Sequence, residues 1–299
     1  MTTVTLTLGP DVRAVDGSRS RDLLRRRLRL SRAAVERLAA RAHVPLPWDL
    51  AASRTDLAAA LGDPPPAPAT EGEPDTELRR SGLLLAGEEL HPDVAAALLT
   101  FARPEVFVDL TLALPRPAGT AQLAAWHRLA GGRVTALTAT ARACELAWFD
   151  VGWWHRALVR LVAAPRPEPD RPAPSDGLRL PLELVLGSGE ALRTQREDVL
   201  AELLSRFGSQ VTVDGTVVTP QGAREVLRAL HLGVQGRLQA VVGSGETRRI
   251  GLVGWLLFSD GWRELAAEAR RPSPLVSVGA VRPEALGTRV ARLVAGVRP

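Results

Sequence analysis

The stretch Val106-Phe-Val-Asp-Leu-Thr-Leu-Ala-Leu114 decides how the chain is interpreted, because apolar and more polar residues alternate along it. Every second residue from Val106 to Leu114 is Val or Leu, and the residues between them include Asp109 and Thr111. A period of two predicts a β-strand that buries one face. The sequence therefore predicts a sheet at this point, and the flanking segments predict its neighbours.

Similar patterns follow this strand along the chain. Apolar, β-prone segments predict further strands at residues 122–129, 134–139 and 144–149. Gly131-Gly132 fits a hairpin turn between the first two. Pro92 suits the first turn of a helix that Pro104 ends, and a second helix is expected over residues 152–163. This part of the chain is thus predicted to form a helix, several antiparallel strands and a helix.

The second half of the chain has a comparable plan. Asp214-Gly215 is a strong hairpin signal within residues 211–218. The other expected elements are strands at 178–186, 234–242, 248–258 and 275–278, and helices at 191–207, 220–230, 261–270 and 283–295. The two halves also share a sequence: residues 160–167 and 292–299 agree at six of eight positions, at an offset of 132. This agreement indicates an internal duplication.

The N-terminal region is predicted to hold a strand at residues 3–8 and an amphipathic, Arg-rich helix at 19–29. Ser31 can cap a helix that runs to about Arg41, and a further helix is expected at 77–84. Prolines mark an exposed loop at 63–74 and a linker at 165–176.

We therefore expect an α+β fold in which a duplicated, pseudo-twofold antiparallel sheet, or pair of sheets, is flanked by helical bundles. Residues 1–164 would form the first half and residues 177–299 the second. The two halves would pack as one quasi-symmetric domain.

Composition limits the function classes. The chain has 299 residues, a net charge of +5 and one cysteine, which excludes an internal disulfide and a multi-thiolate metal site. All 38 basic residues are Arg, as expected from a GC-rich genome, so the charge is weak evidence for nucleic-acid binding. The longest strongly apolar run, about residues 252–258, is too short to span a bilayer, and the N-terminus does not resemble a secretory signal. We expect a cytoplasmic protein without stable membrane insertion.

No residue pattern predicts catalysis, and neither a metal nor a cofactor is expected. The histidines are too far apart in sequence for a local metal motif; they are His43, His91, His127, His155 and His231. Cys144 is expected in the core, His127 as a half-exposed structural residue and His155 as a packed anchor. The Gly-Ser-Gly segments at 187–189 and 243–245 lack the further residues of phosphate-binding loops. An enzyme site assembled from distant residues stays an alternative.

Strand alternation predicts a partner-binding surface. In the strand at residues 248–258, one face carries Ile250, Leu252, Leu256 and Phe258, and the other carries Arg249 and Trp255. If helices cover the first face, the second presents a surface rich in Trp and Arg, the residues enriched at binding hot spots. We expect this surface to consist of Trp126, Arg128, Arg249 and Trp255. The alternative is that a further helix covers the tryptophans.

Two segments resemble the EspG family of type VII (ESX) secretion-associated chaperones. The first is Arg80-Ser-Gly-Leu-Leu-Leu85, followed by Leu90-His-Pro-Asp-Val-Ala-Ala-Ala-Leu-Leu-Thr-Phe-Ala-Arg-Pro-Glu-Val106. The second is the late strand around Trp255, followed by Asp260-Gly-Trp-Arg263. Pro45-Leu-Pro47, after the early helix, agrees as well. The chain departs from the family pattern in its Arg-rich start and its Pro-rich loop at 63–74.

The resemblance implies a function that the residues alone do not. EspG proteins are cytosolic, actinobacterial chaperones of quasi-twofold α/β architecture that bind PE–PPE helical heterodimers and keep them soluble. Membership would make this chain a non-enzymatic chaperone of a helical, PE–PPE-like secretion substrate. A basic nucleic-acid-binding or regulatory protein is the alternative, and self-association stays open. The resemblance identifies no individual binding residue.

Overall fold

The computed structural model describes residues 25–47, 73–85, 88–116, 119–140, 144–163, 169–244, 250–268 and 274–297. The strand expected at residues 3–8 and most of the loop expected at 63–74 lie outside the described residues. The chain divides into two compact units. Unit 1 comprises Met1–Ala164, Gln239–Leu252 and Leu286–Pro299, and unit 2 comprises Pro165–Leu238 and Val253–Ala285.

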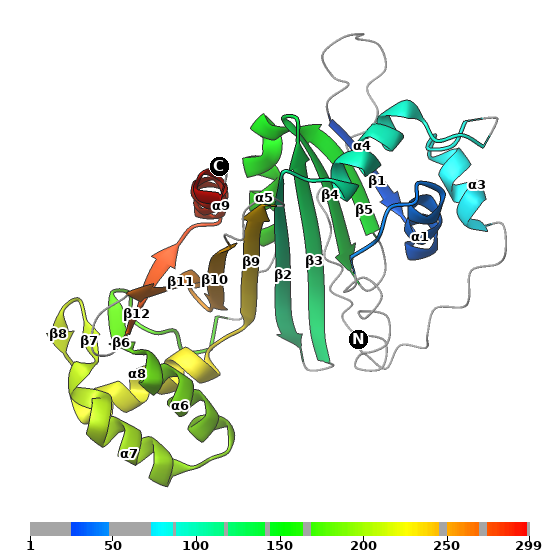
Figure 1. Ribbon diagram of the computed structural model, residues 1–299. Helices are drawn as coiled ribbons and strands as arrows, with labels where there is room; N and C mark the ends of the chain where they lie inside the picture. Colours follow the sequence, from blue (N-terminus) through cyan, green and yellow to red (C-terminus); the bar gives the residue numbers. More distant parts are fainter. Residues whose placement is uncertain are drawn as a thin grey trace. The chain divides into compact units, whose positions relative to one another are not determined.

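Unit 1 is an antiparallel sheet with helices (Figure 1). Its strands, in spatial order, are β1 (Arg25–Leu30), β5 (Cys144–Asp150), β4 (Arg133–Thr140), β3 (Gly119–Ala130), β2 (Val106–Arg116) and β9 (Gly236–Ser244). Its helices are α1 (Arg32–Arg41), α3 (Glu73–Arg80), α4 (Pro92–Ala102), α5 (Trp154–Val162) and α9 (Glu284–Val297). β9 and α9 each begin in unit 2 and continue into unit 1.

Local sequence explains the helices of unit 1. Ser31 accepts the N–H of Ala34 and so caps α1, as expected. Pro92 occupies the first turn of α4, and the Nδ1 atom of His91 accepts the N–H of Asp93. The apolar faces of α1, α3 and α4 join one side of β1, β3, β4 and β5 in a single core cluster.

Unit 2 combines further antiparallel strands with three helices. Its strands, in spatial order, are β10 (Ile250–Phe258), β11 (Gly261–Glu268), β12 (Leu275–Val281), β6 (Leu178–Pro181), β7 (Thr212–Val213) and β8 (Thr216–Val217). Its helices are α6 (Leu182–Arg193), α7 (Glu197–Phe207) and α8 (Pro220–Leu232). These helices pack against β6, β12 and the end of β10 around buried residues such as Leu180, Leu200 and Phe258. β10 begins in unit 1.

The same order of elements occurs twice, which confirms a duplicated α+β fold. The series β1, α1, α3, α4, β2, β3, β4, β5, α5 has a counterpart in β6, α6, α7, α8, β9, β10, β11, β12, α9. Pairing repeats as well, since β1 pairs with β5 and β6 pairs with β12. The packing of the two halves as one quasi-symmetric domain stays a prediction.

The pairing register of the β3–β4 and β10–β11 hairpins corrects the spacing of 132 residues that was expected between the two copies of the repeat. Leu129 pairs with Val134 across the β3–β4 turn, and Leu257 pairs with Trp262 across the β10–β11 turn. Each leucine also accepts an N–H from just before the preceding strand, from Glu105 in the first half and Gln235 in the second. Leu129 and Leu257 are therefore counterparts, 128 positions apart rather than 132.

Four predicted elements are wrong in whole or in part. Residues 25–29 form part of strand β1 rather than a helix, because Leu28 and Leu30 alternate with arginines and face the core cluster. Residues 182–186 begin helix α6, and Gln195, at a φ of 56°, separates α6 from α7 where one helix was expected.

The fourth wrong element is the helix expected at 261–270, where the structure has strand β11. Trp262 and Arg263 are adjacent, yet both are at most 5% exposed, so consecutive side chains are buried on opposite faces. Pairing with β10 on one side and β12 on the other requires the extended backbone.

Candidate functional site

The most exposed apolar side chains of β10 lie at its start. Ile250 is 70% exposed and Leu252 is 62% exposed, and both point to the same face because they are two residues apart in a strand. Val253 and Trp255, on the other face, are at most 4% exposed. Adjacent exposed aliphatic side chains on a sheet face are typical of an interaction site.

β9 and β2 have an open face in unit 1 too. Alternate residues of β9 are exposed or half-buried, among them Gln239 and Val241. On β2, Thr111 is exposed and Asp109 is half-buried, whereas Val108 and Leu110 are at most 1% exposed. We call the side chains of Asp109, Thr111, Gln239, Val241, Ile250 and Leu252 the open face.

Close packing and an ion pair border this face. A Cβ on Gly243 would lie 2.4 Å from the Phe107 Cζ atom, so the phenyl ring packs directly on the β9 backbone. The guanidinium of Arg128 donates to Asp109 Oδ1 at 2.5 Å. The same guanidinium lies 5.2 Å from the Phe101 ring centroid and 5.6 Å from that of Phe107. These contacts fix a rim of mixed charged and aromatic character.

The two tryptophans expected on a partner surface are buried. Trp126 is 3% exposed in the cluster that it shares with α1 and α4, and Trp255 is 1% exposed, with its ring centroid 6.3 Å from that of Trp262. The exposure on which the predicted surface depended is therefore wrong for both residues. Arg128 is brought to the border of the open face, while Arg249 lies outside the described residues.

In β10, the alternation of the two strand faces was predicted correctly, but the face that helices cover was not. The expectation placed helices over the face of Ile250 and Leu252, but helices reach only its far end, where Leu256 and Phe258 join the unit 2 core. An apolar pattern on a strand face normally indicates that the face is covered. The sequence signal that could have found the exposed start of this face is the unusual pair of large aliphatic residues beside Gly251 and Gly254.

The candidate catalytic residues take structural roles. His127 is 1% exposed rather than half-exposed, and its Nδ1 atom accepts the Trp154 Nε1–H at 2.9 Å. Burial lowers the pKa of His127 to about 3, with further lowering by Arg128 and Arg160. Burial raises the pKa of Cys144 to about 11, so its sulfur is a core thiol rather than a thiolate. His155 lies against Gly287 of α9.

Ser188 and His231 form a pair that the sequence analysis missed. Ser188 is fully buried in α6, and its Oγ atom lies 3.0 Å from His231 Nε2 in α8. Gly187 and Gly189, on either side, bring α6 close to Leu203 and His231 respectively. The Gly-Ser-Gly segment is thus a helix-packing surface. Burial lowers the pKa of His231, so the imidazole is neutral near pH 7.

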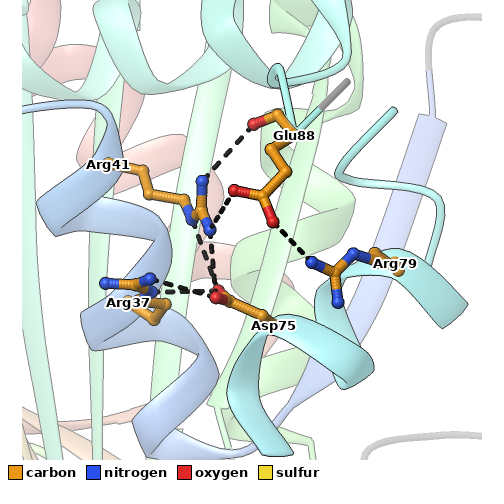
Figure 2. A network of polar contacts seen from close by, with 5 residues as sticks. All are labelled: Arg37, Arg41, Asp75, Arg79 and Glu88. Atoms are coloured by element: carbon orange, nitrogen blue, oxygen red, sulfur yellow. Dashed lines mark hydrogen bonds and ion pairs between the residues drawn. The ribbon is translucent and has the colours of Figure 1, made fainter. Parts of the chain in front are cut away.

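A second missed feature is the charged network in Figure 2. Arg37 and Arg41 of α1 both donate to Asp75 of α3, at 2.9 to 3.3 Å. Arg79 donates to Glu88 at 2.7 Å, and Arg41 reaches the same carboxylate at 3.4 Å. The hydrogen bonds from the two arginines hold the pKa of Asp75 well below its usual range. This network ties α1 to α3 and to the loop after it.

Among the described residues, no group of three or more His, Cys, Asp or Glu side chains could hold a metal ion. Within the same residues, no helix is long and apolar enough to cross a membrane.

Comparison with solved structures is informative about the fold. No protein-family model matches the chain, and no curated protein matches it by sequence. Among solved structures, the Mycobacterium tuberculosis type VII secretion system chaperone EspG5, in complex with a PE25–PPE41 dimer, matches with a TM-score of 0.57. The match covers 92% of this chain and 97% of that chain, at 14% identity. The chain has the EspG fold.

This match confirms the fold that the sequence resemblance implied. It spans both copies of the repeat, because 92% coverage includes most of each half. At 14% identity the similarity shows the fold alone, and the binding partners of EspG5 remain facts about EspG5.

Proposed function

We propose that this protein is a cytoplasmic, non-enzymatic chaperone of a type VII secretion system, and that it keeps a helical, PE–PPE-like substrate soluble. The observation that carries the proposal is the EspG fold over nearly the whole chain, together with the PE25–PPE41 dimer bound to EspG5. The sequence resemblance reached the same family from different data, namely the motifs between Arg80 and Val106.

The open face is the surface that we assign to the client. Its apolar part, Ile250 and Leu252, would cover an exposed apolar strip on the end of a client helix, which would otherwise aggregate. Asp109, whose side chain is 41% exposed beside Arg128, would contribute polar selectivity at the border. This assignment replaces the tryptophans by aliphatic residues and retains Arg128.

The charges of the described arginines favour this function over nucleic-acid binding. Several form ion pairs with carboxylates, among them Arg128 with Asp109, Arg160 with Glu145 and Arg228 with Glu197. A guanidinium that is paired within the chain gives less of the phosphate-binding charge that nucleic acid requires.

Co-purification tests the function and the surface separately. The tagged chain would be expressed with each PE–PPE-like pair encoded next to it, and complexes would be detected by size-exclusion chromatography with light scattering. We expect a stoichiometric complex and a client that is insoluble when expressed alone. If the chain elutes alone with every pair, the chaperone function is wrong.

A charge on the open face tests the assigned surface. We expect Leu252→Asp to abolish the complex, because it places a carboxylate at the centre of an apolar contact. Val217→Asp is the matched control, since Val217 lies on β8 and is 58% exposed, against 62% for Leu252. A complex that survives Leu252→Asp as well as Val217→Asp would refute the surface while leaving the chaperone function intact.

A further inference from the structure

The internal repeat allows β10 to be compared with its own counterpart, β3. Because Leu129 and Leu257 occupy equivalent positions beside their hairpin turns, Trp126 and Gly254 are counterparts, each three residues earlier. A position that holds the largest side chain in one copy thus holds none in the other.

The two positions differ in what lies over them. Trp126 is 3% exposed and packs among the helices of its own half. A Cβ built on Gly254 would meet no atom of the described residues within 4 Å, and the backbone there lies outside the left-handed region. Conformation therefore does not require a glycine at 254, although glycine weakens a strand interior. A glycine in a strand often marks a bulge, a tight bend, or a site where a ligand or another backbone approaches closely.

The residues of β10 that lie on the same face as Gly254 have apolar side chains. Leu252, on the same face, is 62% exposed, and Ile250 beyond it is 70% exposed. On the other side of Gly254, Leu256 and Phe258 pack into a helical core. This face of β10 is therefore apolar along the whole strand. Gly254, which has no side chain, lies where the packing against the unit 2 helices ends.

We propose that Gly254 is a specificity-determining position, which receives one bulky apolar side chain from the helical client in the place that Trp126 fills from within in the other half. This inference rests on the proposed chaperone function. Trp126, at the equivalent position of the other half, indicates the size of the client side chain: an aromatic or large aliphatic group fits at this position of the fold. Leu252 would pack beside the inserted group and Ile250 would extend the contact.

Filling the position from within the chain tests the proposal. The Kd of the client complex would be measured for the wild type and for Gly254→Ala, Gly254→Leu and Gly254→Trp. We expect affinity to fall as the side chain grows, by at least tenfold for Gly254→Trp. Thermal denaturation of Gly254→Ala should show no loss of stability, since its added Cβ has no described neighbour within 4 Å.

Gly296→Trp is the matched control: Gly296 lies on α9, and a Cβ there also meets no atom of the part of the chain that the structure describes within 4 Å. It should bind the client like the wild type. Equal affinity of Gly254→Trp and the wild type would overturn the inference while the chaperone function stands. If Gly254→Trp does not fold, Gly254→Leu decides in the same way. A wild type that binds no client would instead overturn the proposed function, and this inference with it.

Discussion

Acid should destabilise this protein through one buried histidine. The His127 ring is surrounded by apolar and aromatic groups of β3, β5 and α5, stacks on Trp154 and accepts its N–H at Nδ1. The neutral ring therefore carries its proton on Nε2. Protonation of Nδ1 would break this hydrogen bond and bury a charge near Arg128 and Arg160, both of which are already cationic.

The size of the effect follows from the two pKa values. The pKa of His127 is about 3 in the folded state, against an ordinary value of 6.5. The unfolded chain thus binds more protons between these values, so stability is present above pH 6.5 and is lost as the pH falls toward 3. A shift of roughly 3.5 units corresponds to about 5 kcal/mol in total, of which about 2.5 kcal/mol is lost between pH 7 and pH 4.5.

Urea denaturation at pH 7 and pH 4.5, followed by circular dichroism, measures this loss. His127→Gln retains a group that can accept the Trp154 N–H but does not titrate, so its stability should fall by about 2.5 kcal/mol less than that of the wild type. Trp154→Phe tests the hydrogen bond: it should cost about 1–3 kcal/mol at pH 7 and should make the loss on acidification smaller than in the wild type, because protonation of Nδ1 then breaks no hydrogen bond. If the wild type and His127→Gln lose equal stability, the ring is not held neutral by burial.

Three further substitutions test the packing and the charged network. Asp75→Asn removes the acceptor shared by two α1 arginines, so we expect a lower Tm, with a smaller loss at high salt, in thermal denaturation at 50 mM and 500 mM NaCl. Ser188→Ala leaves His231 without its buried partner and should cost about 1–2 kcal/mol in urea denaturation; no cost would mean that the pair does not form. Gly251→Val should lower the Tm, because a Cβ there would lie 2.7 Å from Leu293 Cδ2, and an unchanged Tm would show that α9 packs elsewhere.

The sequence alone was sufficient to predict those helices and strands whose residue pattern allows only one type of secondary structure. The alternation from Val106 to Leu114 corresponds to a strand buried on one face, with Val106, Val108 and Leu110 at most 1% exposed. Ser31 and Pro92 predicted helix starts correctly, because capping depends on atoms within one turn. Local chemistry decides these elements, so no tertiary information was needed.

Two elements, β11 and β6, could not be predicted from the local pattern. β11 has lost the alternation, since Trp262 and Arg263 are both buried on a strand that has neighbours on both sides. At β6 the strand ends after Pro181, and the apolar residues that continue from Leu182 belong to the packed face of α6. In both places tertiary packing outweighs the local pattern.

The dependence on tertiary packing also explains why the exposed residues of the candidate site were not predicted. Alternation assigns residues to two faces of a strand but contains no information about which face a helix covers. In β10 the cover changes along a single face: Phe258 is fully buried, while Ile250 is 70% exposed. The tryptophan of the first half and the glycine of the second also show that the two copies diverged at this face. In a duplicated fold, a position that one copy fills with a buried tryptophan and the other copy occupies with a glycine is a place where a bound partner should be sought.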